Sequence, residues 1–342
     1  MARPSRHVLV LTLLAVVLSL TGCGSDPGTE TAKVGEIVYA KSGVDTTGAP
    51  KTHLLLPSGR LDVRAGAPID ALTGDATHER TARDAPGGGV FVPITWTFRT
   101  AEMARLVPVF GRPLPIEMTL ISGGERYTLS PPVVERDGED VDAYYVAVGG
   151  TGQQLDLEVT YAGVTQMLDL VSGDRSKGQA DGLYSMDTSG YSITPRPCPS
   201  DGWIDEGPAV QVTFSCTSTK PLVVPFVDGK WAPKDHSFVL IGLDTSLSFY
   251  QIHGTSGSGA TYTVSANKDK TELAGKRPAQ VLEKVEQAGI AGGYLVFDLL
   301  GKLPKDLSFH RTYQLQRSAL QGDVDAPDEV TLDIEGTLPL KK

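Results

Sequence analysis

Histidines and cysteines are scarce in this sequence, which limits the metal chemistry that the chain can carry. Its 342 residues include three cysteines and six histidines, and no two histidines stand four residues apart. The sequence therefore lacks the paired histidines of helical zinc proteases and the clustered cysteines and histidines of structural zinc sites. We expect no metal site of these kinds and no cofactor.

Motifs for a catalytic nucleophile or a phosphate-binding loop are also missing. The glycine-rich stretch 254–259 contains no lysine and does not match Gly-x-Ser-x-Gly. Neither Cys198 nor Cys216 has the Ser-His-Gly-x-x-Asn/Asp-Cys context of exported transpeptidases, and Ser-x-x-Lys followed by Lys-Thr-Gly does not occur. We identify no catalytic residue and expect a protein that is not an enzyme.

Basic residues are outnumbered by acidic ones. Lysine and arginine total 31 against 41 aspartates and glutamates, which gives a formal net charge of −10. Phosphate backbones repel such a chain, so we expect no nucleic-acid partner. Charged residues make up 21% and hydrophobic residues 40%, a balance typical of folded domains, and the length indicates about two of them.

Long hydrophobic runs are absent after the first 20 residues. Arg3 and Arg6 precede an apolar stretch at 8–20, which is typical of a signal peptide and short for a transmembrane helix. This stretch leads into Leu20-Thr21-Gly22-Cys23.

The quartet resembles the lipobox of bacterial lipoproteins. The resemblance implies that residues 1–22 are removed and that Cys23 is acylated, which would anchor the protein in the cell membrane on its extracellular face. The polar composition of 24–34 then predicts a flexible tether over 23–34. An ordinary cleaved signal with a free Cys23 and an uncleaved anchor are the alternatives.

Cys198 and Cys216 form the remaining cysteine pair. An even pair in an oxidising compartment predicts a disulfide. A thiol nucleophile is the alternative, but neither cysteine stands beside a histidine.

Turn-forming residues are abundant, with 38 glycines and 23 prolines. Apolar and polar residues alternate with period two at 94–98 and 155–159, which predicts half-buried strands. The segment with the spacing of a helix is 277–289, where Pro278 comes early and Gly289 would end it.

Several strand-like blocks recur in the same order, which predicts a duplicated unit with insertions in the second copy. Chance similarity between short blocks is the alternative. The matched blocks are 89–98 with 207–216, 144–148 with 294–298, 155–161 with 307–313, and more weakly 168–170 with 332–334.

Many short strands and little helix favour β-sandwiches. The Val-x-aliphatic-Thr-aromatic pattern at Val92–Trp96 and Val210–Phe214, together with Tyr294–Asp298, resembles a family: tandem immunoglobulin-like domains behind a lipobox in uncharacterised surface lipoproteins of Gram-positive bacteria, especially actinobacteria. The resemblance implies an all-β fold of two tandem immunoglobulin-like sandwiches and supplies no activity. The polar loop 68–88 and the cysteine pair depart from a simple repeat.

The expected domain organisation follows from these features. It comprises a signal peptide at 1–22, a lipidated cysteine and tether at 23–34, a first sandwich at 35–172, a linker at 173–190, and a second sandwich with one short helix at 191–338. The linker is polar and rich in glycine, so we expect some freedom between the domains.

Three tryptophans are candidates for binding or for packing. Trp231 follows an Asp-Gly-Lys turn, so its ring is a candidate binding residue for a sugar, peptide or protein, with packing over the sandwich edge as the alternative. Trp203 lies inside the disulfide loop and is expected to cover the sulfurs, and Trp96 is expected in the core.

Two acidic runs, 137–142 and 323–329, could supply oxygen ligands for calcium. Neither matches an Asp-x-Asp-x-Asp-Gly loop, so a solvated charge run is the simpler interpretation. His236, His253 and His310 would form a metal site only if folding brought them together.

These observations favour a membrane-anchored, extracytoplasmic lipoprotein that acts as a non-catalytic binding module. Its partner would be a surface protein or a cell-wall polymer. A solute-binding lipoprotein of a transporter and an unrecognised cell-wall enzyme are the alternatives.

Overall fold

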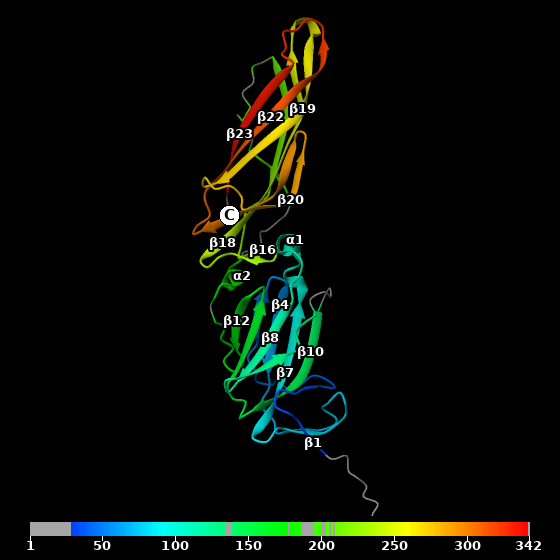
Figure 1. Ribbon diagram of the computed structural model, residues 1–342, viewed down its shortest axis with the longest axis vertical. Coiled ribbons are helices and arrows are strands. Elements are labelled where there is room, and N and C mark those ends of the chain that lie inside the picture. Colours follow the sequence, from blue (N-terminus) through cyan, green and yellow to red (C-terminus); the bar gives the residue numbers. More distant parts are fainter. Residues whose placement is uncertain are drawn as a thin grey trace, which may run out of the picture.

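The computed structural model describes residues 29–133, 139–176, 178–186, 194–199, 203–204, 207 and 209–340. Strands account for 58% of the residues and helices for 6%, so the prediction of an all-β protein is confirmed. Figure 1 shows two β-rich units stacked end to end along the long axis. Within the described ranges, no helix is long and apolar enough to cross a membrane.

The first unit is a sandwich of two antiparallel sheets. The strand order is β2-β10-β7-β4-β3 in one sheet and β12-β11-β8-β9 in the other. The strands are β2 (Ile37–Tyr39), β3 (Thr52–Leu56), β4 (Gly59–Ala65), β7 (Gly89–Arg99), β8 (Ile116–Ser122), β9 (Glu125–Leu129), β10 (Glu139–Gly149), β11 (Leu155–Tyr161) and β12 (Val164–Asp169). Between β7 and β8 the chain forms the short helical turns η1 (Thr100–Glu102), η2 (Ala104–Leu106) and α1 (Val107–Phe110).

Alternating side chains build the core of this sandwich. Leu155, Leu157 and Val159 of β11 are buried, while the residues between them are half-exposed. They share one cluster with Trp96 of the opposite sheet, which confirms the predicted core position of that tryptophan. Burying one large apolar side chain contributes roughly 1.5–3 kcal/mol, so the alternation fixes which face of each strand turns inward.

The folded part begins earlier than the expected boundary after residue 34. β1 (Glu30–Thr31) pairs in parallel with β6 (Arg83–Asp84), and β5 (Ala71–Leu72) completes a small sheet. Ala32 is buried in a separate small core with Phe91 and Ala147. A two-residue strand has too little periodicity to be visible in the sequence, which explains why this segment resembles a tether.

The second unit is built around one long strand, β18 (His236–His253). The N-terminal half of β18 pairs with β15 and β21, and its C-terminal half pairs with β14 and β19. The path continues from β19 to β22 and β23, with β13 and β20 at other edges. The bounds are β13 (Arg196–Pro197), β14 (Val210–Ser218), β15 (Leu222–Val224), β19 (Gly259–Leu273), β20 (Gln280–Gln287), β21 (Ile290–Leu300), β22 (Asp306–Gln321) and β23 (Glu329–Pro339).

Strands from both ends of this path share one hydrophobic core. Val239 of β18 and Phe297 of β21 lie in the same buried cluster as Phe309 of β22 and Leu332 of β23. Register shifts interrupt the β19–β22 pairing near Tyr262 and between Val264 and Ala266. Bulges of this kind bend and twist a strand, which allows one continuous sheet to close around a core.

The predicted helix over 277–289 is wrong. Most of this segment is strand β20, which pairs antiparallel with β21. Pro278 precedes the strand, and Gly289 has φ +80 in the turn that leads into β21. Proline before an element and glycine after it mark a helix or a hairpin equally well, and the β-branched Val281 and Val285 suit the hairpin.

The predicted duplication is not reflected in the strand pairing. β7 and β10 contain the first two blocks of the first unit, and they are direct neighbours. Their matched counterparts, β14 and β21, are both neighbours of β18 and do not pair with each other. The shared residue patterns are therefore typical of strands with one buried face. They do not mark equivalent positions in a repeated fold.

Much of the predicted linker 173–190 packs on the first unit. It contains α2 (Asp181–Ser185), in which Leu183 is buried. The Tyr184 hydroxyl donates to Gln166 Oε1 at 2.8 Å and accepts from the Leu55 amide at 2.9 Å. The guanidinium of Arg175 lies 3.7 Å from the centre of the Tyr184 ring. These contacts fix the described part of the segment against the sandwich.

Candidate functional site

The predicted disulfide is present, and the predicted lipidation site lies outside the described residues. Cys198 and Cys216 are bonded, with their Cα atoms 5.3 Å apart, and both are buried. The bond links the residue directly after β13 to the neighbouring strand β14, at a point where the Cys198 amide donates to the Cys216 carbonyl. Residues 1–28, which include Cys23, are not described.

Trp231 lies at the junction between the two units rather than at an exposed loop tip. It belongs to β17 (Lys230–Trp231), which pairs with β16 (Phe226–Val227). Its indole Nε1 donates to the main-chain oxygen of Tyr161 in the first unit at 2.9 Å. Its ring centre is 5.0 Å from that of Phe226. The structure thus gives Trp231 a packing role, and its role in binding stays a prediction.

The junction is an extension of the first hydrophobic core. Phe226 is fully buried, and its ring lies edge-on to Phe110 at 5.8 Å and tilted against Tyr161 at 5.7 Å. The amides of Asp228 and Gly229 donate to carbonyls of α1. Residues of both units therefore contribute to the hydrophobic core of the first unit. This continuity argues against the interdomain freedom that the linker composition predicts.

A groove of about 750 Å³ lies beside this junction. Its lining comes from three segments that are far apart in the sequence: α2 and its end, residues 220–225 with β15, and the loop 301–305 between β21 and β22. Ser237 and Leu340 complete the walls. We call this feature the lysine groove.

Three lysines give the groove its charge. Lys220, Lys302 and Lys305 are its charged lining residues, and no aspartate or glutamate lines it. None of the three takes part in an ion pair within the described part of the chain. Three uncompensated cations in a chain of net charge −10 create a local positive potential that attracts anionic groups.

Apolar side chains supply most of the remaining surface of the groove. Leu222 and Val224 of β15 are buried at its wall, and Leu303 and Leu340 are half-buried. Ligand sites in proteins usually combine an apolar lining with a few polar groups that orient the ligand. The lysine groove has this composition, and its charged groups are suited to carboxylates or phosphates.

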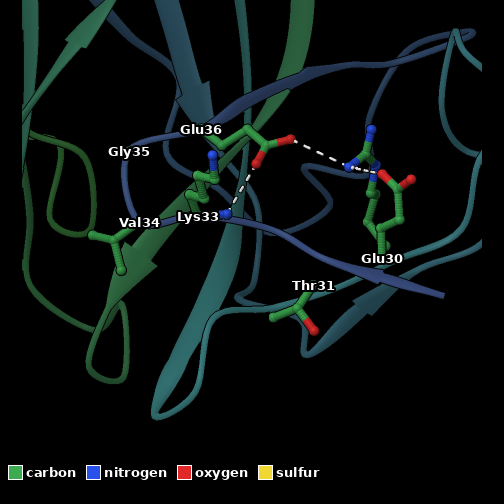
Figure 2. A pocket seen from close by; sticks show the side chains of 7 residues that line it. Glu30, Thr31, Lys33, Val34, Gly35 and Glu36 are labelled. Carbon is green, nitrogen blue, oxygen red and sulfur yellow. Dashed lines mark hydrogen bonds and ion pairs between the residues drawn. The ribbon is translucent and has the colours of Figure 1, made fainter.

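A second pocket, at the N-terminal end of the first unit, is a structural clamp. Figure 2 shows Glu30, Lys33 and Glu36 around this opening of about 800 Å³. The guanidinium of Arg83 lies 2.5 Å from Glu30, 3.2 Å from Glu79 and 3.6 Å from Glu36. Three carboxylates already surround the Arg83 guanidinium, so this cation is held in a structural ion-pair network, and Lys33 is the other basic residue of the lining.

The candidate metal-binding residues do not converge. His236 Nδ1 lies 2.5 Å from Asp298, and His310 Nε2 lies 2.9 Å from Asp333 on a different pair of strands. Hydrogen bonds from Thr312 and from His310 lower the pKa of Asp333. In the described ranges, no group of three or more histidines, cysteines or acidic residues could hold a metal ion.

The acidic runs are only partly described. Residues 137 and 138 lie outside the described residues, and the rest of that run begins β10, where Glu139 pairs with Arg99 at 3.0 Å. In the second run, Asp328 pairs with Arg317. These contacts show acidic side chains that neutralise arginines, and calcium binding at either run stays a prediction.

Sequence reasoning missed the lysine groove. Lys220 and Lys302 belong to segments widely separated along the chain, and neither stands in a charge cluster that would single it out. The weak signals available are Pro221 and Pro225, which bracket an apolar triplet as expected for an edge strand.

Comparisons of this chain with protein-family models, curated proteins and solved structures found no match, so the site rests on its geometry.

Proposed function

We propose that this protein is a lipid-anchored, extracytoplasmic binding protein without catalytic activity, and that the lysine groove is its ligand site. The observation that carries the proposal is the set of three unpaired lysines around an apolar lining, beside the junction of the two units. The ligand would be an anion with apolar surface. Its source would be a surface protein or a cell-wall polymer.

The arrangement of the chain supports an anchored protein. β1, where the described chain begins, lies at the end of the first unit that points away from the second unit (Figure 1). A lipid on Cys23 would therefore hold the first unit nearest the membrane. The lysine groove, beside the junction, would then be separated from the bilayer by the first unit.

The strand order supports an immunoglobulin-like fold for the first unit. Strands β4, β7 and β10 form one sheet, while β8, β11 and β12 lie in the other. The chain therefore crosses between sheets from β7 to β8 and again from β10 to β11, as in immunoglobulin-like Greek keys. The continuous sheet of the second unit follows a different order, so we extend the proposal only to the first unit.

The alternative of a transporter's solute-binding lipoprotein has less support. That class is built from two α/β lobes in which helices alternate with strands. The described helices are all short, the longest being the five residues of α2.

Site-specific crosslinking in cells tests the proposed ligand site. A photoreactive residue replaces Leu303 in the groove, and the control carries it at Glu117, an exposed position of β8 in the first unit. We expect a defined adduct from position 303 that is absent at position 117. It should weaken when Lys220, Lys302 and Lys305 are changed together to glutamine. Equal products at both positions would contradict the proposal.

The anchor is tested separately by metabolic labelling with a clickable fatty acid. Labelled protein should be found in the membrane fraction, and the Cys23→Ala variant should lose both the label and the membrane association. Retention of both by that variant would contradict acylation at Cys23.

A further inference from the structure

The lysine groove runs along the backbone of a strand. Its lining includes all six consecutive residues from Lys220 to Pro225. Side chains of a strand point alternately to opposite faces, so one face of β15 could contribute only every second residue. A groove that touches every residue must follow the edge of the strand, where main-chain groups are accessible.

This edge of β15 has no strand partner in the described part of the chain. β15 pairs antiparallel with β18, through Leu222 with Leu240 and Val224 with Phe238. No other pairing of β15 is present among the described residues. Open edges of this kind accept an added strand from another chain.

We propose that the occupant of the lysine groove is an extended acidic segment of a partner protein, which adds as a strand to the open edge of β15 and places its carboxylates near Lys220, Lys302 and Lys305. This inference rests on the function proposed above and specifies the ligand class of the same site. An added strand alternates its side chains, so a segment in which acidic and apolar residues alternate presents one set to the lysines and the other to the apolar lining.

Two prolines limit the length of the added strand. Pro221 and Pro225 have no N–H to donate, so the amides of this edge come from Leu222, Val223 and Val224. Because the N–H groups of successive strand residues point to opposite edges, only alternate members of these three face the open side, and the others face β18. Main-chain pairing over three residues spans roughly 10 Å. So short an edge does not support open-ended aggregation, and the lysines and apolar contacts must supply the remaining affinity.

The apolar lining favours a peptide over a polyanionic wall polymer. A polyol phosphate has neither apolar side chains for Leu303 and Leu340 nor amides for the strand edge, so only the lysines would hold it. Leu300, directly before the groove loop, is 63% exposed, which adds apolar surface at this end of β21. A peptide with branched apolar residues can cover such surface, whereas a polyol phosphate cannot.

The test uses the full mature chain in detergent and a fluorescein-labelled octapeptide in which glutamate and valine alternate. Fluorescence anisotropy measures binding at low ionic strength. A lysine–valine octapeptide and a glycerol-phosphate oligomer are the comparison ligands. The third comparison is the acidic peptide with N-methyl groups on alternate residues of its backbone, which removes donors needed for strand addition without altering its charge.

We expect the acidic octapeptide to bind and the lysine–valine peptide to fail. Changing Lys220, Lys302 and Lys305 together to glutamine should weaken binding about tenfold, because the charge pairs at the groove are lost. The matched variant changes Lys268, Lys276 and Lys284, three exposed lysines elsewhere in the second unit, and should bind as the unaltered protein does. Bound acidic peptide should also slow amide exchange in residues 222–224. The N-methylated peptide should neither bind nor slow this exchange.

Different failures point to different errors. Equal binding of the N-methylated peptide would overturn strand addition while leaving the groove as a ligand site. Binding of the glycerol-phosphate oligomer without binding of the acidic peptide would overturn the peptide occupant and leave the proposed function intact. Binding of neither ligand would overturn the inference, and if the crosslink at position 303 were also absent, the proposed function would fail with it.

Discussion

The indole Nε1 of Trp231 donates a hydrogen bond to the main-chain oxygen of Tyr161, and this 2.9 Å contact joins the two β units. Nearby, the Gln179 side-chain amide donates to the Ala232 carbonyl at 2.5 Å. Both bonds hold the β16–β17 hairpin against the first unit. Because β15 directly precedes this hairpin, the same contacts position one wall of the lysine groove.

Replacing Trp231 should loosen the junction in two steps. Trp231→Phe removes the hydrogen bond and keeps an aromatic ring, which should cost about 1 kcal/mol of unfolding free energy. Trp231→Ala also removes the ring from its place beside Phe226 and should cost about 3 kcal/mol. We expect the alanine variant alone to broaden the interdomain distances measured by small-angle scattering. Lys230→Ala, at the neighbouring exposed residue, is the control. If the scattering profiles of Trp231→Ala and Lys230→Ala superimpose, other contacts hold the junction.

The disulfide should stabilise the second unit. Cys198 and Cys216 are separated by 18 residues, and closing a loop of this size contributes about 3 kcal/mol through the restricted unfolded chain. The Cys198→Ser, Cys216→Ser double variant should lose stability by about this amount in urea denaturation. Adding reductant to the unaltered protein should give the same loss and should leave the double variant unchanged. A double variant as stable as the oxidised protein would contradict this account.

Arg311 and Asp269 should respond unequally to substitution. Arg311 is 1% exposed in the core of the second unit, where it pairs with Asp269 and donates to Thr245 and Thr271 at 2.9 and 3.0 Å. Burial lowers the pKa of the arginine to about 10. The aspartate keeps 39% of its side chain exposed, so water can solvate it when its partner is lost.

We therefore expect Asp269→Asn to be the more harmful change. It leaves a buried cation without a counter-charge and should cost about 3 kcal/mol in urea denaturation. Arg311→Met replaces the cation with an apolar side chain of similar length, so its cost should be smaller. Asp325→Asn, at an exposed position of the same unit, is the control. The reverse order of the two losses would show that the guanidinium and its threonine contacts, rather than the charge balance, stabilise this core.

Local patterns in the sequence predicted strands well and their pairing poorly. The alternation at 94–98 and 155–159 identifies parts of β7 and β11, because a period of two depends only on which face is buried. Pairing is a non-local property. The matched blocks 144–148 and 294–298 are both strands, yet one lies beside β7 and the other beside β18.

The candidate site was less accessible to sequence reasoning than the fold. Trp231 stands out in the sequence because an aromatic follows a turn, but nothing local shows that its indole donates to the main-chain oxygen of Tyr161. Lys220 and Lys302 are ordinary surface lysines in the sequence, and only the shared position of β15 and the loop 301–305 brings them together. The disulfide is the exception, because an oxidising compartment and two remaining cysteines are enough to predict the pairing.

Arg83 should hold the N-terminal segment in place. Its guanidinium joins β6 to Glu30 and Glu36, which precede and follow the buried Ala32. Arg83→Ala should therefore expose the chain around Lys33 and raise its rate of tryptic cleavage at least about fivefold, because protection depends on local opening. Arg83→Lys keeps the charge and loses the forked geometry, so an intermediate rate is expected.

The exposed Arg112 provides the comparison for this measurement. Arg112→Ala should leave cleavage at Lys33 unchanged. Equal cleavage of the Arg83→Ala variant and this control would show that strand pairing and the burial of Ala32 suffice to fix the segment.

Stability should fall in alkaline solution because of buried tyrosines. Burial raises the pKa of seven of them: Tyr144, Tyr145, Tyr161, Tyr184, Tyr262, Tyr294 and Tyr313. Phenols in the unfolded chain ionise near pH 10, whereas these keep their protons in the fold. Above about pH 10 the unfolded state therefore binds fewer protons, and the free energy of unfolding decreases as the pH rises. The lowered pKa of Arg311 acts in the opposite direction, but it is a single group.

Tyr144 gives this prediction a specific variant. Its side chain is fully buried, and its hydroxyl has no hydrogen-bond partner among the described residues. Removing an unpaired hydroxyl costs little, so Tyr144→Phe should match the unaltered protein within about 0.5 kcal/mol at pH 7. Between pH 10 and pH 11 the variant should lose less stability than the unaltered protein. It has one phenol fewer that ionises in the unfolded chain and stays protonated in the fold. Tyr39→Phe, at a residue that is 46% exposed, is the control variant. Urea denaturation followed by circular dichroism across this pH range measures the difference, and parallel profiles for all three proteins would mean that buried phenols do not govern alkaline unfolding.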